Sequence, residues 1–273
     1  MRRHRLLNVH PSQEVIPAQR RAMILDIVRT RGAISIRDLA QAMGTSASTV
    51  RRDLEHLQAS GYLRRAHGGA LIACAPLSTF EPAQSVSAGL ARAQKRAIGQ
   101  AAAALLTPGE AVVFDSSSTV LEAAKAVVER RIVLTAVTND LAIGEILTRA
   151  SEIRVIVTGG TIRPGSLTLT GEPGLGFLAG LHIETALIGV HAICDGLLTE
   201  TSLEIAAMKR TMIASARRVV VLADATKFQP TAFCTIADAA VVDHLITDAT
   251  ADKHALERLR ELGVTVTQAG APE

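Results

Sequence analysis

The sequence predicts two domains: a small, mostly α-helical domain at the N-terminus and a larger α/β domain built on a largely parallel sheet. The chain has 273 residues, and at roughly 150 residues per domain this length favours two domains. It is 48% hydrophobic but only 2% aromatic, a composition typical of buried parallel strands and close helix packing. From residue 94 onward short apolar runs alternate with helical patterns, whereas helical periodicity dominates before residue 73.

Charge is distributed unevenly between these two parts. Residues 1–72 hold twelve Arg, no Lys and five acidic residues, a net charge of +7, whereas residues 73–273 carry −4. This asymmetry predicts a basic module that binds a polyanion, joined to a near-neutral body. The scarcity of aromatic residues argues against recognition of single-stranded RNA by base stacking.

Other features limit the compartment and the chemistry. The three Cys residues lie far apart and form no zinc-binding spacing, which predicts free thiols in a reducing cytoplasm: Cys74, Cys194 and Cys234. We expect no secretory signal, because the basic first ten residues run into polar ones, and no membrane span, because no apolar run is long enough. Neither a GxGxxG nor a GxxxxGK[ST] pattern occurs, so we expect no dinucleotide or P-loop site and no cofactor, and the absence of zinc-binding spacing predicts no metal.

Residues 18–72 read as three helices and a hairpin, preceded by a flexible basic arm over residues 1–17. In the first helix, which ends at Gly32, four apolar residues fall on one face: Met23, Ile24, Ile27 and Val28. Ser35 is the expected N-cap of a second helix, which Gly44 closes. Thr45 or Ser46 caps a third helix to about residue 60, with three residues inward: Val50, Leu54 and Leu57.

A short hairpin over residues 62–70 completes the pattern of a winged helix-turn-helix, whose third helix enters the major groove by its N-terminal end. Hydroxyl groups and arginines at that end suit phosphates and base edges. The candidate DNA-binding residues are Ser35, Ser46, Ser48, Thr49, Arg51, Arg52, Arg64, Arg65 and His67. Taken singly, each also fits an ordinary helix cap or a solvated arginine; together, with the local charge of +7, they favour DNA binding.

Three strings carry a resemblance to a known family: STVRRDLEHL (48–57), GYLRR (61–65) and HGGA (67–70). Residues 18–72 resemble the DNA-binding module of the DeoR family of bacterial transcriptional regulators. The resemblance implies that residues 46–52 form the front of the recognition helix.

Residues 73–93 are expected to be a linker, because they contain Pro76, Pro82 and Gly89 and show no sustained period. In the domain over residues 94–273, strands are expected at 111–114, 132–137, 153–157, 186–190, 219–222, 241–246 and 264–267. Helices are expected between most of them, which predicts a Rossmann-like parallel sheet with helices on both faces.

Polar residues and glycines follow most of these strands, at the sheet edge where ligands of open α/β sheets bind. The loop 116–119 opens a helix and so offers an anion site, while fixed cations complement a phosphate. These features together predict a small phosphorylated polyol as ligand. The candidate effector-binding residues are Asp115, Ser116, Ser117, Ser118, Thr119, Thr138, Asn139, Gly159, Gly160, Arg163, His191 and Lys209. Each alone also fits capping or turn chemistry.

The second part of the chain also resembles the DeoR family, through FDSSST (114–119), VTN (137–139), GGTIR (159–163), GE (171–172), Glu204 with KR (209–210) and LADATKF (222–228). The resemblance implies a sensor domain that shares its fold with ribose-5-phosphate isomerase and binds a phosphorylated sugar. Two positions depart from the family pattern: Ser117 stands where the family has Gly, and His191 where it has Asp.

We therefore expect a non-enzymatic transcriptional regulator, most simply a repressor of a sugar-utilisation operon, that binds double-stranded operator DNA as a homodimer or larger homo-oligomer. Two alternatives stay open: a sugar-phosphate isomerase with an appended DNA-binding module, and an RNA-binding adaptor. His191 at the usual acidic position weakens the first, and the scarcity of aromatic residues weakens the second.

Overall fold

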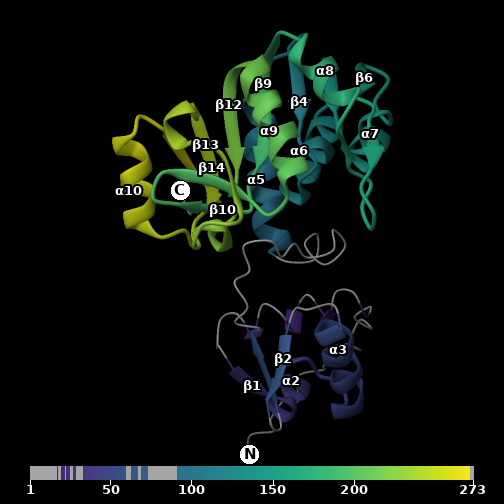
Figure 1. Cartoon of the computed structure of the whole chain (residues 1–273), viewed down its shortest axis with the longest axis vertical. Coiled ribbons are helices and arrows are strands. Elements are labelled where there is room, and N and C mark those ends of the chain that lie inside the picture. Colours follow the sequence, from purple (N-terminus) through teal and green to yellow (C-terminus); the bar gives the residue numbers. More distant parts are fainter. Residues whose placement is uncertain are drawn as a thin grey trace, which may run out of the picture. The chain divides into compact units, whose positions relative to one another are not determined.

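The computed structural model describes residues 17, 20, 21, 23, 24, 27, 28, 33–59, 63–66, 69–72 and 91–270. Contacts divide the chain into two compact units, Met1–Ala73 and Cys74–Glu273, and each is considered by itself (Figure 1). Among the described residues, no helix is both long enough and apolar enough to cross a bilayer.

The N-terminal unit combines helices with a small antiparallel sheet. Its described residues between 17 and 28 are helical. They are followed by β1 (Ala33–Ser35), α2 (Ile36–Ala42), α3 (Ala47–Ala59), β2 (Leu63–Ala66) and β3 (Gly69–Ile72). The three strands pair antiparallel in the order β1-β3-β2. The expected hairpin is thus β2 and β3, and β1 is an added strand too short for the sequence pattern to reveal.

Helix boundaries in this unit follow from capping. The hydroxyl of Ser35 accepts a hydrogen bond from the Asp38 amide at 3.1 Å, which starts α2. Gly44 then adopts a φ of +59°, which lets the chain turn toward α3. The core is aliphatic: Ile24, Val28, Ile34, Leu39, Val50, Leu54 and Leu57. Met23 is 42% exposed, so its expected place on the buried face is wrong; it lies on the flank of that face.

The C-terminal unit contains a sheet of seven parallel strands, as predicted. In sequence order they are β4 (Ala111–Phe114), β5 (Leu134–Thr138), β6 (Ile153–Val157), β9 (Ile183–Gly189), β12 (Ala216–Leu222), β14 (His244–Asp248) and β15 (Thr265–Ala269). In space their order is β15-β14-β12-β9-β4-β5-β6. The chain builds outward from β4 to β6, then returns to place β9 on the other side of β4. The strand order therefore reverses between β4 and β9.

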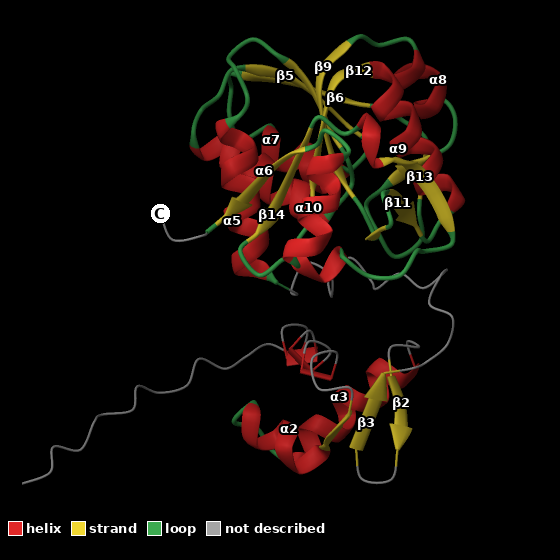
Figure 2. Cartoon of the chain, turned by 90° about the vertical axis from the view of Figure 1, so that its left-hand side faces the viewer, coloured by secondary structure: helices red, strands yellow, loops and turns green. Residues whose placement is uncertain are grey.

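Helices cover both faces of this sheet because successive strand residues point to opposite faces. Val112 and Phe114 pack with α5 (Arg92–Ala104), α6 (Ser118–Glu129) and α7 (Leu141–Leu147). Val113 packs on the other face with α8 (Gly174–Ala179), α9 (Leu203–Ser215) and α10 (Lys253–Glu261). Figure 2 shows α6 and α7 on one side of the sheet and α8 and α9 on the other.

Several short elements were not expected from the sequence. The pair β7 (Thr161–Ile162) and β8 (Leu169–Thr170) forms a hairpin after β6. A second antiparallel sheet joins β10 (Ala192–Cys194), β11 (Leu197–Glu200) and β13 (Cys234–Asp238). Asp195 and Gly196 link β10 to β11 with φ values of +50° and +78°. An Asp-Gly pair is a known hairpin signal, so this turn was readable from the sequence.

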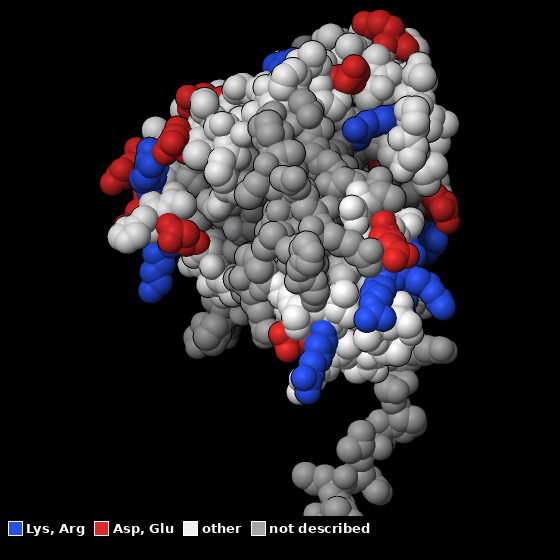
Figure 3. Space-filling view, turned by 60° about the horizontal axis from the view of Figure 1, so that its bottom comes forward, with Lys and Arg blue, Asp and Glu red and all other residues white. Residues whose placement is uncertain are grey.

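Surface charge shows no large patch of one sign on the face of the described residues drawn in Figure 3. Lys and Arg side chains lie interspersed with Asp and Glu. Recognition of a charged ligand on such a surface depends on individually placed groups rather than on a broad field.

Phe114 tests the packing of this sheet, since it is fully buried in the interior strand β4. Phe114→Ala should lower the free energy of unfolding of the C-terminal unit by about 3–5 kcal/mol through the cavity it leaves. Phe233→Ala is the matched control, because Phe233 is 52% exposed and should cost little. Chemical denaturation of both variants measures the difference, and equal losses would contradict the assigned core.

Candidate functional sites

The first turn of α3 carries a cluster of hydroxyl groups. Ser46 precedes the helix, and its Oγ accepts a hydrogen bond from the Thr49 amide at 3.2 Å. The same Oγ lies 2.8 Å from the Ser48 hydroxyl and 2.9 Å from the Thr49 hydroxyl. Ser46 and Ser48 are exposed and Thr49 is half-buried. These groups cap the helix and also present hydrogen-bonding atoms at its N-terminal end.

The arginines of α3 lie on its outer face. Val50 is fully buried, whereas Arg51 and Arg52 are exposed. Of the other predicted DNA contacts, Ser35 lies at the start of α2, where its hydroxyl donates to the Asp38 carboxylate at 2.7 Å. Arg64 and Arg65 lie in β2, but their side chains are outside the described part of the structure, as is all of His67.

A buried carboxylate marks the point at which the strand order of the C-terminal unit reverses. Asp115 follows β4 directly and is fully buried. Its Oδ2 accepts a hydrogen bond of 2.9 Å from the Gly189 amide at the end of β9. Its Oδ1 is buried without a hydrogen-bond partner. In open α/β sheets this reversal leaves a crevice at the carboxyl ends of the strands, which is where ligands bind.

A buried lysine from α9 completes the cluster. The Lys209 ammonium donates to the Gly189 carbonyl at 2.8 Å and to Glu200 Oε2 at 2.6 Å, and lies 3.4 Å from Asp115 Oδ2. Lys209 is 4% exposed, and its ammonium already has carboxylate partners within the protein. Glu200, at the end of β11, was not among the predicted site residues. Glu200 is buried because β11 pairs with β10, and this pairing was not predicted from the sequence.

The two carboxyl groups respond differently to this environment. Burial raises the pKa of Asp115 above its ordinary value, because desolvation outweighs the nearby Lys209 charge. Burial also opposes ionisation of Glu200, but the charge of Lys209 and its short hydrogen bond prevail and hold the pKa of Glu200 below its ordinary value. The Lys209–Glu200 contact is therefore the ion pair of this cluster, with Asp115 beside it.

The start of α6 lies against the same cluster. The Ser117 hydroxyl caps α6 by accepting from the Val120 amide at 3.1 Å. A Cβ atom on residue 189 would lie 2.2 Å from Ser117 Oγ, so Ser117 occupies its place only because residue 189 is glycine. Ser116 and Ser118 are half-buried and Thr119 is buried.

Lys95 adds a cation at this helix start that the sequence analysis missed. It lies on α5, is 3% exposed, and its ammonium donates to Ser118 Oγ at 3.0 Å. The signal was present in the sequence: Lys95 shares a helix face with the buried Ile98 and Ala102, where an apolar residue is the norm. A buried ammonium beside a helix N-terminus favours a bound anion.

The ends of β5 and β6 supply further polar groups. The Thr138 hydroxyl donates to the Phe114 carbonyl at 2.8 Å, which ties β5 to β4. Asn139 is fully buried; its amide donates to the Leu169 carbonyl at 3.0 Å, while its Oδ1 has no hydrogen-bond partner. After β6, Gly159 and Gly160 have φ values of +76° and +119°. A Cβ atom on residue 160 would lie 2.7 Å from the Thr170 carbonyl oxygen, so this position requires glycine.

Two predicted residues lie at the border of the cluster. Arg163 is half-buried after β7, and its charge contributes, after the Ser202 hydrogen bond, to the lowered pKa of Glu204. His191 follows β9 and is half-buried, and its charge likewise favours ionisation of Glu200. The structure thus brings Asp115, Ser117, His191 and Lys209 together around the end of β9. Asn139, the two glycines and Arg163 lie after the next strands along the sheet.

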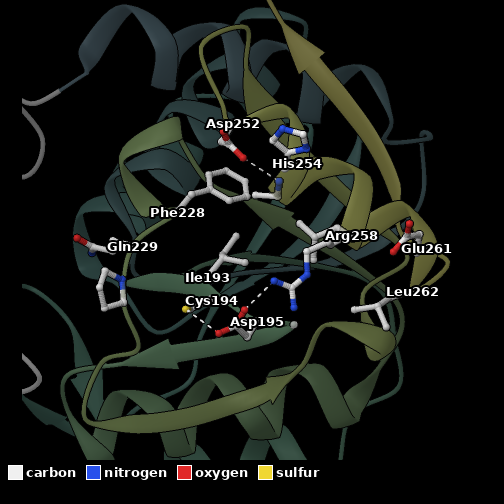
Figure 4. Close-up of a pocket in the computed structure, with 14 residues that line it drawn as sticks. Ile193, Cys194, Asp195, Phe228, Gln229, Asp252, His254, Arg258, Glu261 and Leu262 are labelled. Carbon is white, nitrogen blue, oxygen red and sulfur yellow. Dashed lines mark hydrogen bonds and ion pairs between the residues drawn. The ribbon is translucent and has the colours of Figure 1, made fainter.

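A hollow of about 670 Å³ lies elsewhere in this unit, between the β10–β11 turn, residues 228–230 and α10 (Figure 4). Ile193 and Phe228 face it, and Arg258 pairs with Asp195 across its rim at 2.8 Å. None of the predicted effector residues lines it, so it is separate from the cluster around Asp115.

Two family models match the chain in the order in which its units occur. Residues 20–74 match the DeoR-like helix-turn-helix domain, and residues 91–249 match the DeoR C terminal sensor domain. A helix-turn-helix domain followed by a sensor domain defines a transcriptional regulator.

Curated relatives give the same result over nearly the whole chain. A putative aga operon transcriptional repressor of Escherichia coli O157:H7 is 32% identical over 255 residues, covering 93% of this chain and 94% of the relative. An uncharacterized HTH-type transcriptional regulator, YgbI, of E. coli K12 is 32% identical over 234 residues, covering 86% of this chain and 91% of the relative. The chain therefore belongs to the DeoR family of transcriptional regulators.

Among solved structures, ribose 5 phosphate isomerase A from Neisseria gonorrhoeae is similar with a TM-score of 0.36 and 14% identity, covering 50% of this chain and 52% of that chain. A likeness at this level says nothing about activity.

Glu200→Gln tests the ion pair at the reversal point. Because the folded-state pKa of Glu200 lies below its ordinary value of 4.5, its charged form stabilises the fold above that pH, and this contribution is lost as the pH falls through the folded value. The variant should therefore lose about 3 kcal/mol at pH 7, with the difference from wild type shrinking below pH 4.5.

The measurement is denaturant unfolding at pH 7 and pH 4. Glu145→Gln is the control, because Glu145 pairs with Arg149 at 3.0 Å on an exposed surface and should change stability little at either pH. A loss for Glu200→Gln that does not depend on pH would contradict the assigned pair.

Proposed function

We propose that this regulator represses a carbohydrate-utilisation operon. A phosphorylated sugar, bound in the C-terminal unit, would release the regulator from operator DNA or re-position it there. Relatives named as repressors support the direction of regulation, among them a transcriptional repressor, GlcR, from Bacillus subtilis that is 31% identical over 232 residues. The proposal includes a cytoplasmic location, because its ligands are DNA and a metabolite.

The DNA contacts are proposed from the outer face of α3. Hydroxyls of Ser46 and Ser48 at the helix start suit phosphate oxygens, and the exposed Arg51 and Arg52 suit guanine edges or phosphates. We keep Ser35, Thr49, Arg64, Arg65 and His67 as further contacts from the helix starts and the wing. Helix-turn-helix domains bind the two half-sites of a two-fold operator as dimers, so we propose a homodimer or larger assembly.

The effector site is proposed at the reversal point, and one observation carries it. Asp115 Oδ1 and Asn139 Oδ1 are buried acceptors without partners, at the ends of the adjacent strands β4 and β5. Leaving a buried acceptor unpaired costs about 1–3 kcal/mol. Sugar hydroxyls are donors that would satisfy both oxygens.

The phosphate is proposed at the start of α6. Amides of residues 116, 118 and 119 and the helix dipole favour an anion there, and the buried Lys95 ammonium, which donates to Ser118 Oγ, adds a positive charge. Lys209 contacts Glu200 and Asp115, so we propose that it orients these carboxylates rather than neutralising the phosphate. Arg163 and His191 would contact the sugar from the rim.

Binding rather than turnover is proposed for this site. Isomerisation requires a base placed at the reacting carbon and free to exchange its proton. In this chain the Lys209–Glu200 pair is closed within the protein, and a histidine stands after β9. The curated relatives reported above are named as regulators.

Arg51→Ala and Arg52→Ala test the DNA-reading role of α3. Each should weaken binding to a duplex selected from a random library with the wild-type chain by about tenfold or more, because a good arginine contact contributes about 1–3 kcal/mol. Fluorescence anisotropy over a salt series is the measurement, since the loss of a phosphate contact also reduces the salt slope. Arg149→Ala removes the same charge from the C-terminal unit and should leave affinity unchanged; unchanged affinity in both α3 variants would refute the placement.

Asp115→Asn and Lys95→Met test the effector site. One or more phosphorylated sugars should raise the thermal unfolding midpoint of the wild type by more than the parent sugar or inorganic phosphate alone does. At a ligand concentration of a hundred times Kd, the expected gain in unfolding free energy is about 2.7 kcal/mol. Asp115→Asn should lose the response to the sugar, and Lys95→Met the preference for its phosphate.

Lys125→Met is the matched control for the lysine, because Lys125 pairs with Glu122 further along α6, its side chain is 38% exposed, and it should respond as wild type does. The same incubations should contain no isomerised sugar. A panel without any phosphosugar response, or a response that survives in both site variants, would move the effector elsewhere.

A further inference from the structure

Asp53 is a charged residue on the buried face of α3. It shares that face with Val50, Leu54 and Leu57, at the spacing that normally holds apolar side chains. Asp53 is 2% exposed, so its carboxylate is removed from water. A carboxylate in such a position is stable only if both oxygens are paired.

Two consecutive arginines of the first helix supply these partners. Arg20 Nε lies 2.5 Å from Asp53 Oδ2, and Arg21 Nε lies 3.0 Å from Asp53 Oδ1. The arginine side chains are themselves 16% and 26% exposed, so both contacts are largely shielded from solvent. Each carboxylate oxygen thus has its own guanidinium, and one side chain of α3 is held at two points by the neighbouring helix.

The hydrogen bonds between Asp53 and the two arginines depend on direction, whereas the aliphatic contacts around them do not. Leu54 and Leu57 gain nearly the same energy from burial if α3 rotates or slides slightly. A carboxylate held between two guanidinium groups loses its hydrogen bonds under the same movement, because these bonds require a fixed distance and angle. The pair therefore restricts the rotation of α3 about its axis and its position along that axis.

The restricted segment lies beside the DNA-reading side chains. Asp53 directly follows Arg51 and Arg52, which are exposed on the same helix. A rotation of α3 that the aliphatic core tolerates would move both arginines relative to the base edges. Resting on the proposed role of α3 at the operator, we infer that Asp53 is a positioning residue: clamped by Arg20 and Arg21, it sets the orientation of the recognition helix and so its sequence specificity.

Part of the basic charge of this unit is engaged within the unit itself. Arg20 and Arg21 count toward the +7 of residues 1–72, yet they contact a buried carboxylate of the same unit. We expect the salt slope of DNA binding to reflect the exposed arginines and not these two.

The test compares Asp53→Asn with Glu55→Gln in the full-length chain. Both substitutions remove one negative charge from α3, so general attraction to DNA rises equally; only Asp53 is buried and clamped, whereas Glu55 is exposed. Affinity is measured for the library-selected duplex and for a shuffled duplex of the same composition. Circular dichroism fixes a temperature at which both variants are folded.

We expect Asp53→Asn to reduce the ratio of specific to shuffled affinity at least tenfold, with shuffled binding unchanged or tighter, and Glu55→Gln to keep the ratio. A variant damaged only in folding would lose both affinities in parallel, and this result, like an unchanged ratio, overturns the inference. Should Asp53→Asn be unfolded at every usable temperature, Arg21→Lys, which keeps the charge but removes the planar guanidinium, is judged by the same ratio. A wild-type chain that prefers no duplex would refute the proposed function itself, and the clamp with it.

Discussion

The return of the chain from β6 to a place beside β4 is the constraint on which the C-terminal site depends. It sets β9 next to β4, so that the Gly189 amide meets the Asp115 carboxylate at 2.9 Å. That contact uses one carboxylate oxygen and leaves the other buried and unpartnered. Lys209 then approaches both strand ends from α9, and Glu200 balances its charge. A different strand order would separate these groups.

Both units use the same physical device, a buried charge with a fixed set of partners. In the N-terminal unit Asp53 joins α3 to the first helix through two arginines. In the C-terminal unit the Lys209–Glu200 pair joins α9 to β11. Aliphatic burial supplies most of the stability in each unit, but it is weakly directional. Paired charges orient the elements that carry the proposed contacts.

Periodicity and turn residues were enough to predict the seven parallel strands and the helices around them except the short α8, because these patterns are local. They also placed Asp115, Asn139 and Gly160 at strand ends. The small elements β7, β8, β10, β11 and β13 were missed because they pair in short antiparallel sheets outside the parallel one, although Asp195-Gly196 between β10 and β11 is a hairpin signal. Lys95 and Asp53 were overlooked although each interrupts an apolar helix face. Glu200 could not be recognised, because only the pairing of β11 with β10 and β13 brings it to Lys209.

We propose that binding of the effector and binding of the operator are linked through this chain, and such linkage is reciprocal. The most direct measurement is the affinity of the wild-type chain for its stabilising phosphosugar, by calorimetry, with and without saturating selected duplex. A repressor released by its effector should bind the sugar more weakly on DNA, by the same factor by which the sugar weakens DNA binding. Equal sugar affinity in both states would contradict the claim.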